Sequence, residues 1–319
     1  MTSSPEPAPV ASVPPRPRRI PVHGVLLLDK GAGLSSNDAL IKAKRLLNAA
    51  KAGHTGTLDP FATGLLPLCF GEATKFAQDL LEADKSYEAI VHLGVTTTTG
   101  DTEGDTLAEH PVDPGLTVAA IEAVLSRFRG PILQTPPMYS ALKRDGKPLY
   151  EYARAGITLE RAARALTIHT LELLSFDAPL LRLKVCCSKG TYVRVLGEDI
   201  GAALGCGAHL QTLRRTAVGT LVLAQAVTLE QLAAVADGSR AAILAPVDAL
   251  LSSFPLIALD EPLAQRFMNG QRLSLGKEGL AVPPGATRVR VYRASDDCLL
   301  GTARIREFDV LAPERLVAF

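Results

Sequence analysis

Residues 51–72 form a long apolar segment that has the periodicity of neither a helix nor a strand. Glycines and prolines interrupt it at positions 53, 56, 60, 64, 67 and 71. A loop of this length inside a compact domain is uncommon unless it serves a function. The segment therefore predicts either a functional loop or an element that periodicity alone does not identify.

Regular elements are expected on both sides of this segment. Alternating or buried apolar runs predict strands at 25–29, 87–93, 168–176 and 181–188. Amphipathic runs predict helices at 36–50 (capped by Ser35 or Ser36), 75–83, 118–128, 148–155, 195–204 and 228–236. Beyond residue 254 the pattern changes to short β segments, at 289–293, 299–307 and 316–319, around one helix near 262–268. We therefore expect a large domain at 21–250 and a small β-rich domain at 251–319.

The first 20 residues are expected to form a disordered arm. The first 21 residues hold seven of the 22 prolines, together with Arg16, Arg18 and Arg19. The prolines prevent the amphipathic helix of a transit peptide, and the apolar core of a signal peptide is missing. The arm is therefore expected to make contact with phosphates at most.

Cysteine, histidine and apolar patterns argue against a metal centre and a membrane span. The five cysteines form no CxxC pair, the six histidines form no HExxH motif, and Cys206 with His209 lacks a second pair of ligands. Prolines and Asp248 interrupt the apolar run 241–259. The glycines form no P-loop. We expect a protein of the reducing cytoplasm that has neither a disulfide framework nor a zinc ribbon.

Charge is balanced overall but not locally. The net charge of +1 argues against an indiscriminate nucleic-acid binder. Residues 76–125 hold ten acids against one base, whereas residues 126–155 hold six bases against two acids. This pattern fits either ordinary solvated faces or a basic face for a polyanion.

Four residues are candidates for chemistry or binding, each with a simpler alternative. Asp59 lies between apolar residues and before Pro60, which fits a catalytic carboxylate or an Asx-turn. Arg194 follows a glycine turn and could pair with a carboxylate, bind phosphate or lie on the surface. Tyr87 opens a strand and could stack on a base or simply pack. Leu213, followed by two arginines, fits the edge of an RNA groove or an ordinary strand end.

These residues belong to motifs that resemble the TruB family of tRNA pseudouridine synthases. The motifs are Gly24–Gly31, Leu34–Asn37, Gly53–Phe76, Lys85–Tyr87, Pro136–Lys143, Tyr150–Ala153, Cys187–Arg194, Gly205–Leu210 and Leu213–Arg215. The resemblance covers residues 24–219 in the right order. It implies the α+β pseudouridine synthase fold, with a mixed, largely antiparallel central sheet flanked by helices. The β-rich C-terminal domain would then be a PUA-like RNA-binding domain.

The resemblance also implies a reaction, the isomerisation of uridine 55 in the T loop of tRNA to pseudouridine without metal or cofactor. Asp59 matches the catalytic aspartate, acting as nucleophile at C1′ or base at C2′, and Arg194 matches its partner. Tyr87 matches the tyrosine that stacks on the uracil and relays a proton, Tyr192 a second aromatic residue of the pocket, and Leu213 an apolar residue of its wall. His54 matches the histidine that fills the vacated base stack, and Lys75 matches a basic residue that flanks the site and binds the substrate. The expected partner is tRNA, through its T stem-loop, and the protein is expected to be a monomer without membrane contact.

Two other classes of protein compete with this interpretation. Basic residues at 126–220 and a terminal RNA-binding domain would suffice for an RNA chaperone without chemistry. A glycoside hydrolase would need two carboxylates that flank the sugar, and the motifs supply one aspartate with an arginine.

Overall fold

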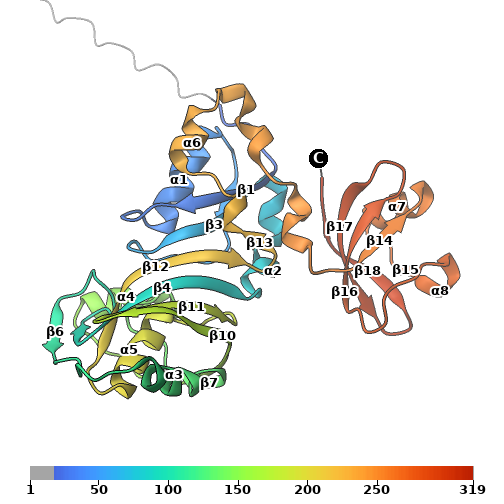
Figure 1. Cartoon of the computed structure of the whole chain (residues 1–319). Coiled ribbons are helices and arrows are strands. Elements are labelled where there is room, and N and C mark those ends of the chain that lie inside the picture. Colours follow the sequence, from blue (N-terminus) through green and yellow to red (C-terminus); the bar gives the residue numbers. More distant parts are fainter. Residues whose placement is uncertain (1–17, 319) are drawn as a thin grey trace, which may run out of the picture.

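The computed structural model describes residues 18–318, so that most of the expected N-terminal arm lies outside the described residues (Figure 1). The last residues of the expected arm are held by the body of the protein. The amide of Ile20 donates to the carbonyl of Asn48 at 2.9 Å. Nη1 of Arg19 donates to the carbonyl of Ala49 at 3.2 Å. Residues 18–20 thus differ from the free arm that the proline content predicts.

A mixed, largely antiparallel sheet of nine strands forms the centre of the larger part (Figure 1). Seven strands follow the order β1-β3-β12-β4-β11-β10-β7, and β2 and β13 pair beside them. Their bounds are β1 (Gly24–Lys30), β2 (Ala52–His54), β3 (Thr63–Phe70), β4 (Lys85–Leu93), β7 (Gly130–Gln134), β10 (Arg164–Asp177), β11 (Leu180–Cys187), β12 (Ala208–Val218) and β13 (Leu221–Val222). Among the pairs of this sheet, β3 and β12 run parallel. The expected sheet is confirmed.

Helices cover both faces of this sheet. Helices α1 (Ser36–Leu46), α3 (Val118–Ser126) and α5 (Val193–Ala203) share one apolar core with β1, β3, β4 and β12. The other face packs against η1 (Gly71–Phe76), α2 (Ala77–Leu81) and η4 (Val247–Leu251). Shorter elements are the hairpins β5 (Val95–Thr97)–β6 (Thr106–Glu109) and β8 (Lys143–Arg144)–β9 (Lys147–Pro148), and α4 (Leu149–Arg154), η2 (Leu223–Gln225), α6 (Leu229–Ala234) and η3 (Asp237–Ile243). No helix within residues 18–318 is long and apolar enough to cross a membrane.

Helix α1 begins where the sequence predicts, because the side chain of Ser35 accepts a hydrogen bond from the amide of Asp38 at 3.1 Å. The apolar segment 51–72, in contrast, is not one loop. Strand β3 takes up its second half and lies between β1 and β12. A strand buried on both faces shows no alternation of polar and apolar residues, which is why periodicity does not identify it. Only residues 55–62 remain as a loop.

The C-terminal part is a curled β structure of the PUA-like type. Its five strands follow the order β14-β16-β17-β18-β15. The bounds are β14 (Leu256–Leu259), α7 (Glu261–Met268), β15 (Leu273–Ser274), α8 (Leu275–Glu278), β16 (Arg288–Arg293), β17 (Cys298–Arg306) and β18 (Val310–Leu316). Strand β14 is not predicted by the sequence, and the last strand covers 310–316 instead of 316–319. The difference arises because Phe308 and Asp309 have positive φ and turn the chain tightly.

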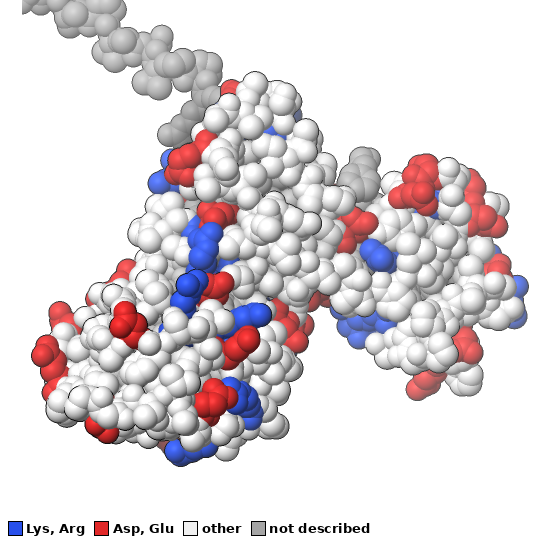
Figure 2. Space-filling view, viewed as in Figure 1, with Lys and Arg blue, Asp and Glu red and all other residues white. Residues whose placement is uncertain are grey.

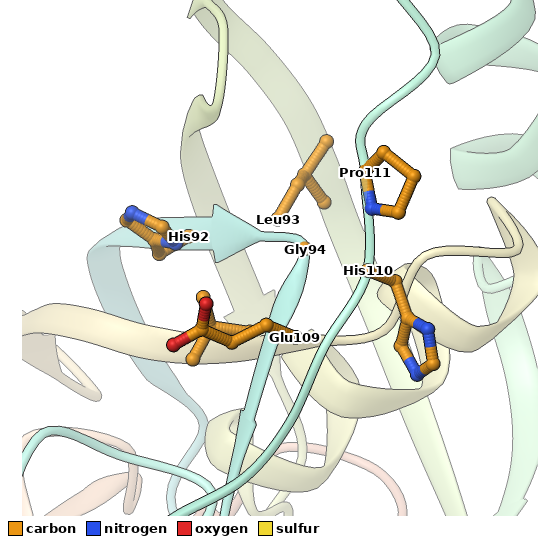
Figure 3. Close-up of a pocket in the computed structure, with 7 residues that line it drawn as sticks. His92, Leu93, Gly94, Glu109, His110 and Pro111 are labelled. Carbon is orange, nitrogen blue, oxygen red and sulfur yellow. The ribbon is translucent and has the colours of Figure 1, made fainter.

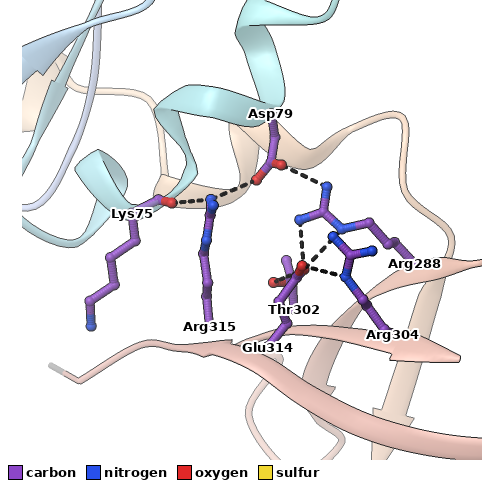
Figure 4. A network of polar contacts seen from close by, with 7 residues as sticks. All are labelled: Lys75, Asp79, Arg288, Thr302, Arg304, Glu314 and Arg315. Carbon is purple, nitrogen blue, oxygen red and sulfur yellow. Dashed lines mark hydrogen bonds and ion pairs between the residues drawn. The ribbon is translucent and has the colours of Figure 1, made fainter. Parts of the chain in front are cut away.

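The two parts are joined by apolar and charged contacts. Tyr292, Leu299 and Val317 of the C-terminal part belong to the same apolar cluster as η1, α2 and η4. Asp79 on α2, whose side chain is 6% exposed, accepts hydrogen bonds from Arg288 at 2.7 Å and from Arg315 at 3.3 Å (Figure 4). The C-terminal sheet is thereby fixed to the larger part. The division into 21–250 and 251–319 remains a prediction.

Candidate active site

The loop between β2 and β3 presents Asp59 from a backbone that is held on both sides. The hydroxyl of Ser36 accepts a hydrogen bond from the amide of Leu58 at 2.8 Å and donates to its carbonyl at 3.0 Å. The carbonyl of Pro60 accepts from the amide of Gly33 at 2.8 Å and from Nζ of Lys30 at 3.2 Å. Because both neighbours of Asp59 are anchored, its side chain has little freedom to move away.

Arg194 is the partner of Asp59. It lies in the first turn of α5, its side chain is 4% exposed, and its Nε is 2.9 Å from Oδ2 of Asp59. Nη1 donates to the carbonyl of Thr99 at 2.7 Å, and Nη2 to that of Tyr139 at 2.6 Å. The guanidinium is therefore buried and bound along all of its edges. It is not the surface arginine that its local sequence allows, and Asp59 is paired rather than closing an Asx-turn.

A second carboxylate, which the sequence does not single out, shares this arginine. Oδ2 of Asp101 is 3.5 Å from Nε of Arg194, and the Asp101 side chain is 4% exposed. Its Oδ1 accepts hydrogen bonds from the hydroxyl of Thr99 and the amide of Glu103. The Asp59 side chain, at 36% exposure, is the accessible member of the pair. In the sequence, Asp101 is one acid in an acidic run, and nothing nearby distinguishes it.

The electrostatics of the cluster work against the charged form of Asp59. Burial raises the pKa of its carboxyl, the Arg194 guanidinium opposes that rise, and Asp101 adds to it. Lys30, whose Nζ donates to three backbone carbonyls, has its pKa lowered by burial to about 8, although Asp59 and Glu103 oppose this. The ionisation of Asp59 thus depends on Arg194.

Two tyrosines lie within the field of the Asp59 charge. Tyr87 on β4 is buried, and burial raises the pKa of its phenol, against the effect of Arg215. Tyr192 precedes α5, and its backbone amide and carbonyl both bind the side chain of Gln134, at 2.8 and 3.1 Å. Burial also raises the pKa of Tyr192, and the Asp59 charge adds to both shifts. The site thus combines the Asp59 carboxylate with two tyrosines in largely desolvated surroundings.

The other predicted site residues are distributed unequally. Leu213 is buried in the same apolar core as Tyr87. His54 ends β2, its Nδ1 is buried without a hydrogen-bond partner within residues 18–318, and burial lowers its pKa. Lys75 is not brought to this cluster. Its Nζ binds Glu72 at 2.6 Å and the carbonyl of Leu316 at 2.8 Å. Figure 4 shows Lys75 beside the C-terminal sheet, where its backbone carbonyl accepts a hydrogen bond from Arg315.

A separate pocket lies at the ends of β4 and β6. It has a volume of about 370 Å³, and its lining includes His92, Glu109 and His110 (Figure 3). The ring of His92 stacks on that of His209 at 5.2 Å, and Nδ1 of His209 is 2.9 Å from the carbonyl of Val95. None of the site residues described above lines this pocket. Within the part of the chain that the structure describes, no three His, Cys, Asp or Glu side chains are placed to hold a metal ion.

Comparisons with known proteins cover almost the whole chain. Residues 44–193 match the family profile described as TruB family pseudouridylate synthase (N terminal domain), and 194–252 match the tRNA pseudouridylate synthase B C-terminal domain. Residues 255–317 match the profile of pseudouridine synthase II TruB, C-terminal. The tRNA pseudouridine synthase B of Burkholderia mallei (strain ATCC 23344) is 64% identical over 313 residues, or 97% of this chain and 99% of that protein. The enzyme of the same name from Cupriavidus metallidurans is 61% identical over 311 residues, 96% of this chain and 98% of that protein.

Solved structures show the same fold. A chain in the structure of an H/ACA RNP bound to a substrate RNA containing 2′-deoxyuridine superposes with a TM-score of 0.70 at 24% identity, covering 93% of this chain and 86% of that one. A chain of the archaeal box H/ACA sRNP Nop10–Cbf5 complex gives a TM-score of 0.69 at 26% identity with the same coverage. The expected fold class is thus confirmed.

Proposed function

Because the chain belongs to the TruB family and is a tRNA pseudouridine synthase, we propose that its target is uridine 55 of the T loop and that Asp59 is its catalytic carboxylate. The observation that carries this proposal is the Asp59–Arg194 pair at 2.9 Å. The arginine and Asp101 are buried, whereas Asp59 is accessible. Asp59 is therefore the carboxylate of this cluster that can meet a substrate.

The reaction requires a small number of events. The C1′–N1 bond breaks, the uracil rotates, and C5 bonds to C1′; C5 loses a proton, and N1 gains one. Asp59 can serve as the nucleophile at C1′ or as the base at C2′. Either role needs the ionised carboxylate, which Arg194 favours in a desolvated site.

We propose the remaining roles from the resemblance of these residues to the family motifs. Tyr87 stacks on the flipped uracil and relays the C5 proton, Tyr192 closes the pocket, and Leu213 forms its apolar wall. Flipping the base out of the T loop costs a few kcal/mol, and His54 occupies the vacated stack. We do not assign Lys75 to the substrate, because its ammonium is bound to Glu72 and to the carbonyl of Leu316.

The surface offers positive charge for RNA. The hairpin β8–β9 carries Lys143, Arg144 and Lys147, all of them exposed. Figure 2 shows a band of basic side chains, with acidic ones among them, that crosses the middle of the catalytic part. We propose that the enzyme acts as a monomer in the cytoplasm and contacts the T stem-loop through the β8–β9 hairpin and this basic band. Salt should then weaken binding steeply, because phosphate contacts release counterions.

Tritium release from C5-labelled uridine in a T stem-loop tests the reaction. The wild-type protein should release tritium, whereas Asp59→Asn should bind the RNA and release none. Glu88→Gln is a matched control, because Glu88 also pairs with an arginine, at 2.7 Å, but is half exposed on β4; it should retain turnover. Release from Asp59→Asn would refute the catalytic role. Release from a stem-loop that carries cytidine at position 55 and labelled uridines elsewhere would refute the target.

The two competing classes fit these observations less well. Asp101 does supply a second carboxylate, but it is buried and shares one guanidinium with Asp59. The two are not arranged on either side of a sugar as a glycoside hydrolase requires. A chaperone without chemistry would not need an accessible aspartate that is paired with a buried arginine beside two tyrosines.

A further inference from the structure

Arg215 is a buried cation that the proposed reaction does not yet use. It lies on β12, is 1% exposed, and forms no ion pair with a carboxylate within residues 18–318. Burial lowers the pKa of its guanidinium, and the charge of the Tyr87 phenol opposes this. Burying an unpaired charge is costly unless its hydrogen bonds are satisfied. The hydrogen-bond partners of the guanidinium therefore indicate why this charge is buried.

Three elements of the site meet at this guanidinium. Nε donates to the carbonyl of Leu65 on β3 at 2.7 Å, and Nη2 is 3.4 Å from the carbonyl of Gly56 in the Asp59 loop. The third element is Tyr87 on β4, where the guanidinium lowers the pKa of the phenol against the effect of burial. Arg215 and Tyr87 are register partners on β12 and β4, so that their side chains lie on the same face of the sheet.

From this geometry we infer that Arg215 is a positioning residue, which orients the Tyr87 hydroxyl and holds the Asp59 loop against β3. The inference rests on the proposed role of Tyr87. In the relay, the phenol first gives its proton to water, the resulting phenolate oxygen then takes the C5 proton, and the C–H electron pair returns to the ring. The guanidinium stays protonated and balances the negative charge that develops on the oxygen.

The other groups that face Tyr87 do not replace this effect. Cys187 on β11 and Asp59 in the loop both raise the pKa of the phenol, and Arg215 alone among the named neighbours lowers it. Removing the Arg215 charge should therefore make the relay harder at every pH. Lysine would keep the charge but cannot reach three acceptors with a rigid fork, so that rescue should be partial.

The first test measures the phenol directly. The ¹³Cζ chemical shift of Tyr87, assigned with Tyr87→Phe, reports hydrogen bonding at the phenol oxygen. It should move in Arg215→Gln and stay unchanged in Arg214→Lys, a control on the same strand whose arginine pairs with Asp29 at 2.7 Å. An unchanged shift in Arg215→Gln would overturn the inference. This readout does not depend on turnover, so that failure of the proposed function leaves it intact.

The second test measures single-turnover tritium release from the T stem-loop, with RNA affinity followed in parallel. Misplacing a catalytic group costs about 10²-fold. Arg215→Gln should therefore lower the single-turnover rate by about that factor. The rate should also begin to rise at a higher pH than in wild type, whereas the affinity for RNA should be nearly unchanged. Arg215→Lys should lie between Arg215→Gln and wild type. If Arg215→Gln does not fold, a wild-type rate and pH profile in Arg215→Lys would overturn the inference.

Discussion

Replacing Arg194 by alanine should affect stability and turnover through different partners. The guanidinium binds two carboxylates, Asp59 and Asp101, and two backbone carbonyls. Its removal leaves Asp101, at 4% exposure, as a buried charge without a cation. Breaking a buried ion pair in this way costs about 3–5 kcal/mol of folding free energy. Asp59 is more exposed and contributes less to this loss.

A second substitution separates the two effects. Asp101→Asn removes the stranded charge, so that the double variant should recover about 1–3 kcal/mol, the usual coupling between residues in contact. Turnover should not recover, because Asp59 still lacks the cation that opposes the rise of its pKa. In both variants we expect turnover to fall by about 10²–10⁴-fold at neutral pH. Raising the pH should restore part of it by deprotonating Asp59.

Urea unfolding and single-turnover tritium release measure the two effects on the same variants. Arg182→Ala is the control, because its ion pair with Glu88 is 55% and 41% exposed and should be worth less than about 1 kcal/mol. Equal stability of Arg194→Ala with and without Asp101→Asn would refute the stranded-charge argument. Full turnover in Arg194→Ala would refute the dependence of Asp59 on its partner.

Three further predictions follow from the charges and the interface. Because burial raises the pKa of Asp59, its ionisation destabilises the folded protein as the pH rises above the ordinary value of 3.8. The thermal stability of Asp59→Asn relative to wild type should therefore increase from pH 4 to pH 7. A stability difference that does not change with pH would contradict this. The pKa of Lys30 is about 8 in the folded protein against the ordinary value of 10.5, so the unfolded chain binds more protons between these two pH values. The free energy of unfolding should therefore rise by about 3 kcal/mol over this range. Unfolding measured as a function of pH should not show this rise in Lys30→Met. Asp79→Asn should cost about 1–3 kcal/mol and increase hydrogen exchange at the buried amide of Val317; unchanged exchange there would show that Asp79 does not hold the interface.

The sequence predicts best where one face of an element meets the core and the other meets water. Strand β4 alternates along its whole length and α1 begins at its capping serine, so the sequence places this strand and the start of this helix correctly, although α1 ends at Leu46 and not near residue 50. Strand β3 is buried on both faces, and β18 begins only after a tight turn at Phe308 and Asp309. Local periodicity misses β3 because the neighbouring strands β1 and β12 decide its burial, and it misses the start of β18 because the turn decides where that strand begins.

The candidate site shows the same division. Asp59, Tyr87 and Arg194 belong to motifs, and the structure brings them together from three separate segments. Asp101 is selected by its distance from Arg194, which depends on the fold of the β5–β6 hairpin. The position of Lys75 depends on a C-terminal strand about 240 residues away, at 2.8 Å in space. Such long-range contacts have no local signature.

The joint between the two parts of the chain has a consequence for any ligand large enough to touch both. Asp79 binds two arginines of the C-terminal sheet, and Val317 is buried in the shared cluster. Because these contacts hold the C-terminal sheet against α2, the fold itself sets the spacing between Asp59 and the outer C-terminal strands. A bound RNA must match that spacing with its own helical length, whereas a tethered domain would accept a range of lengths.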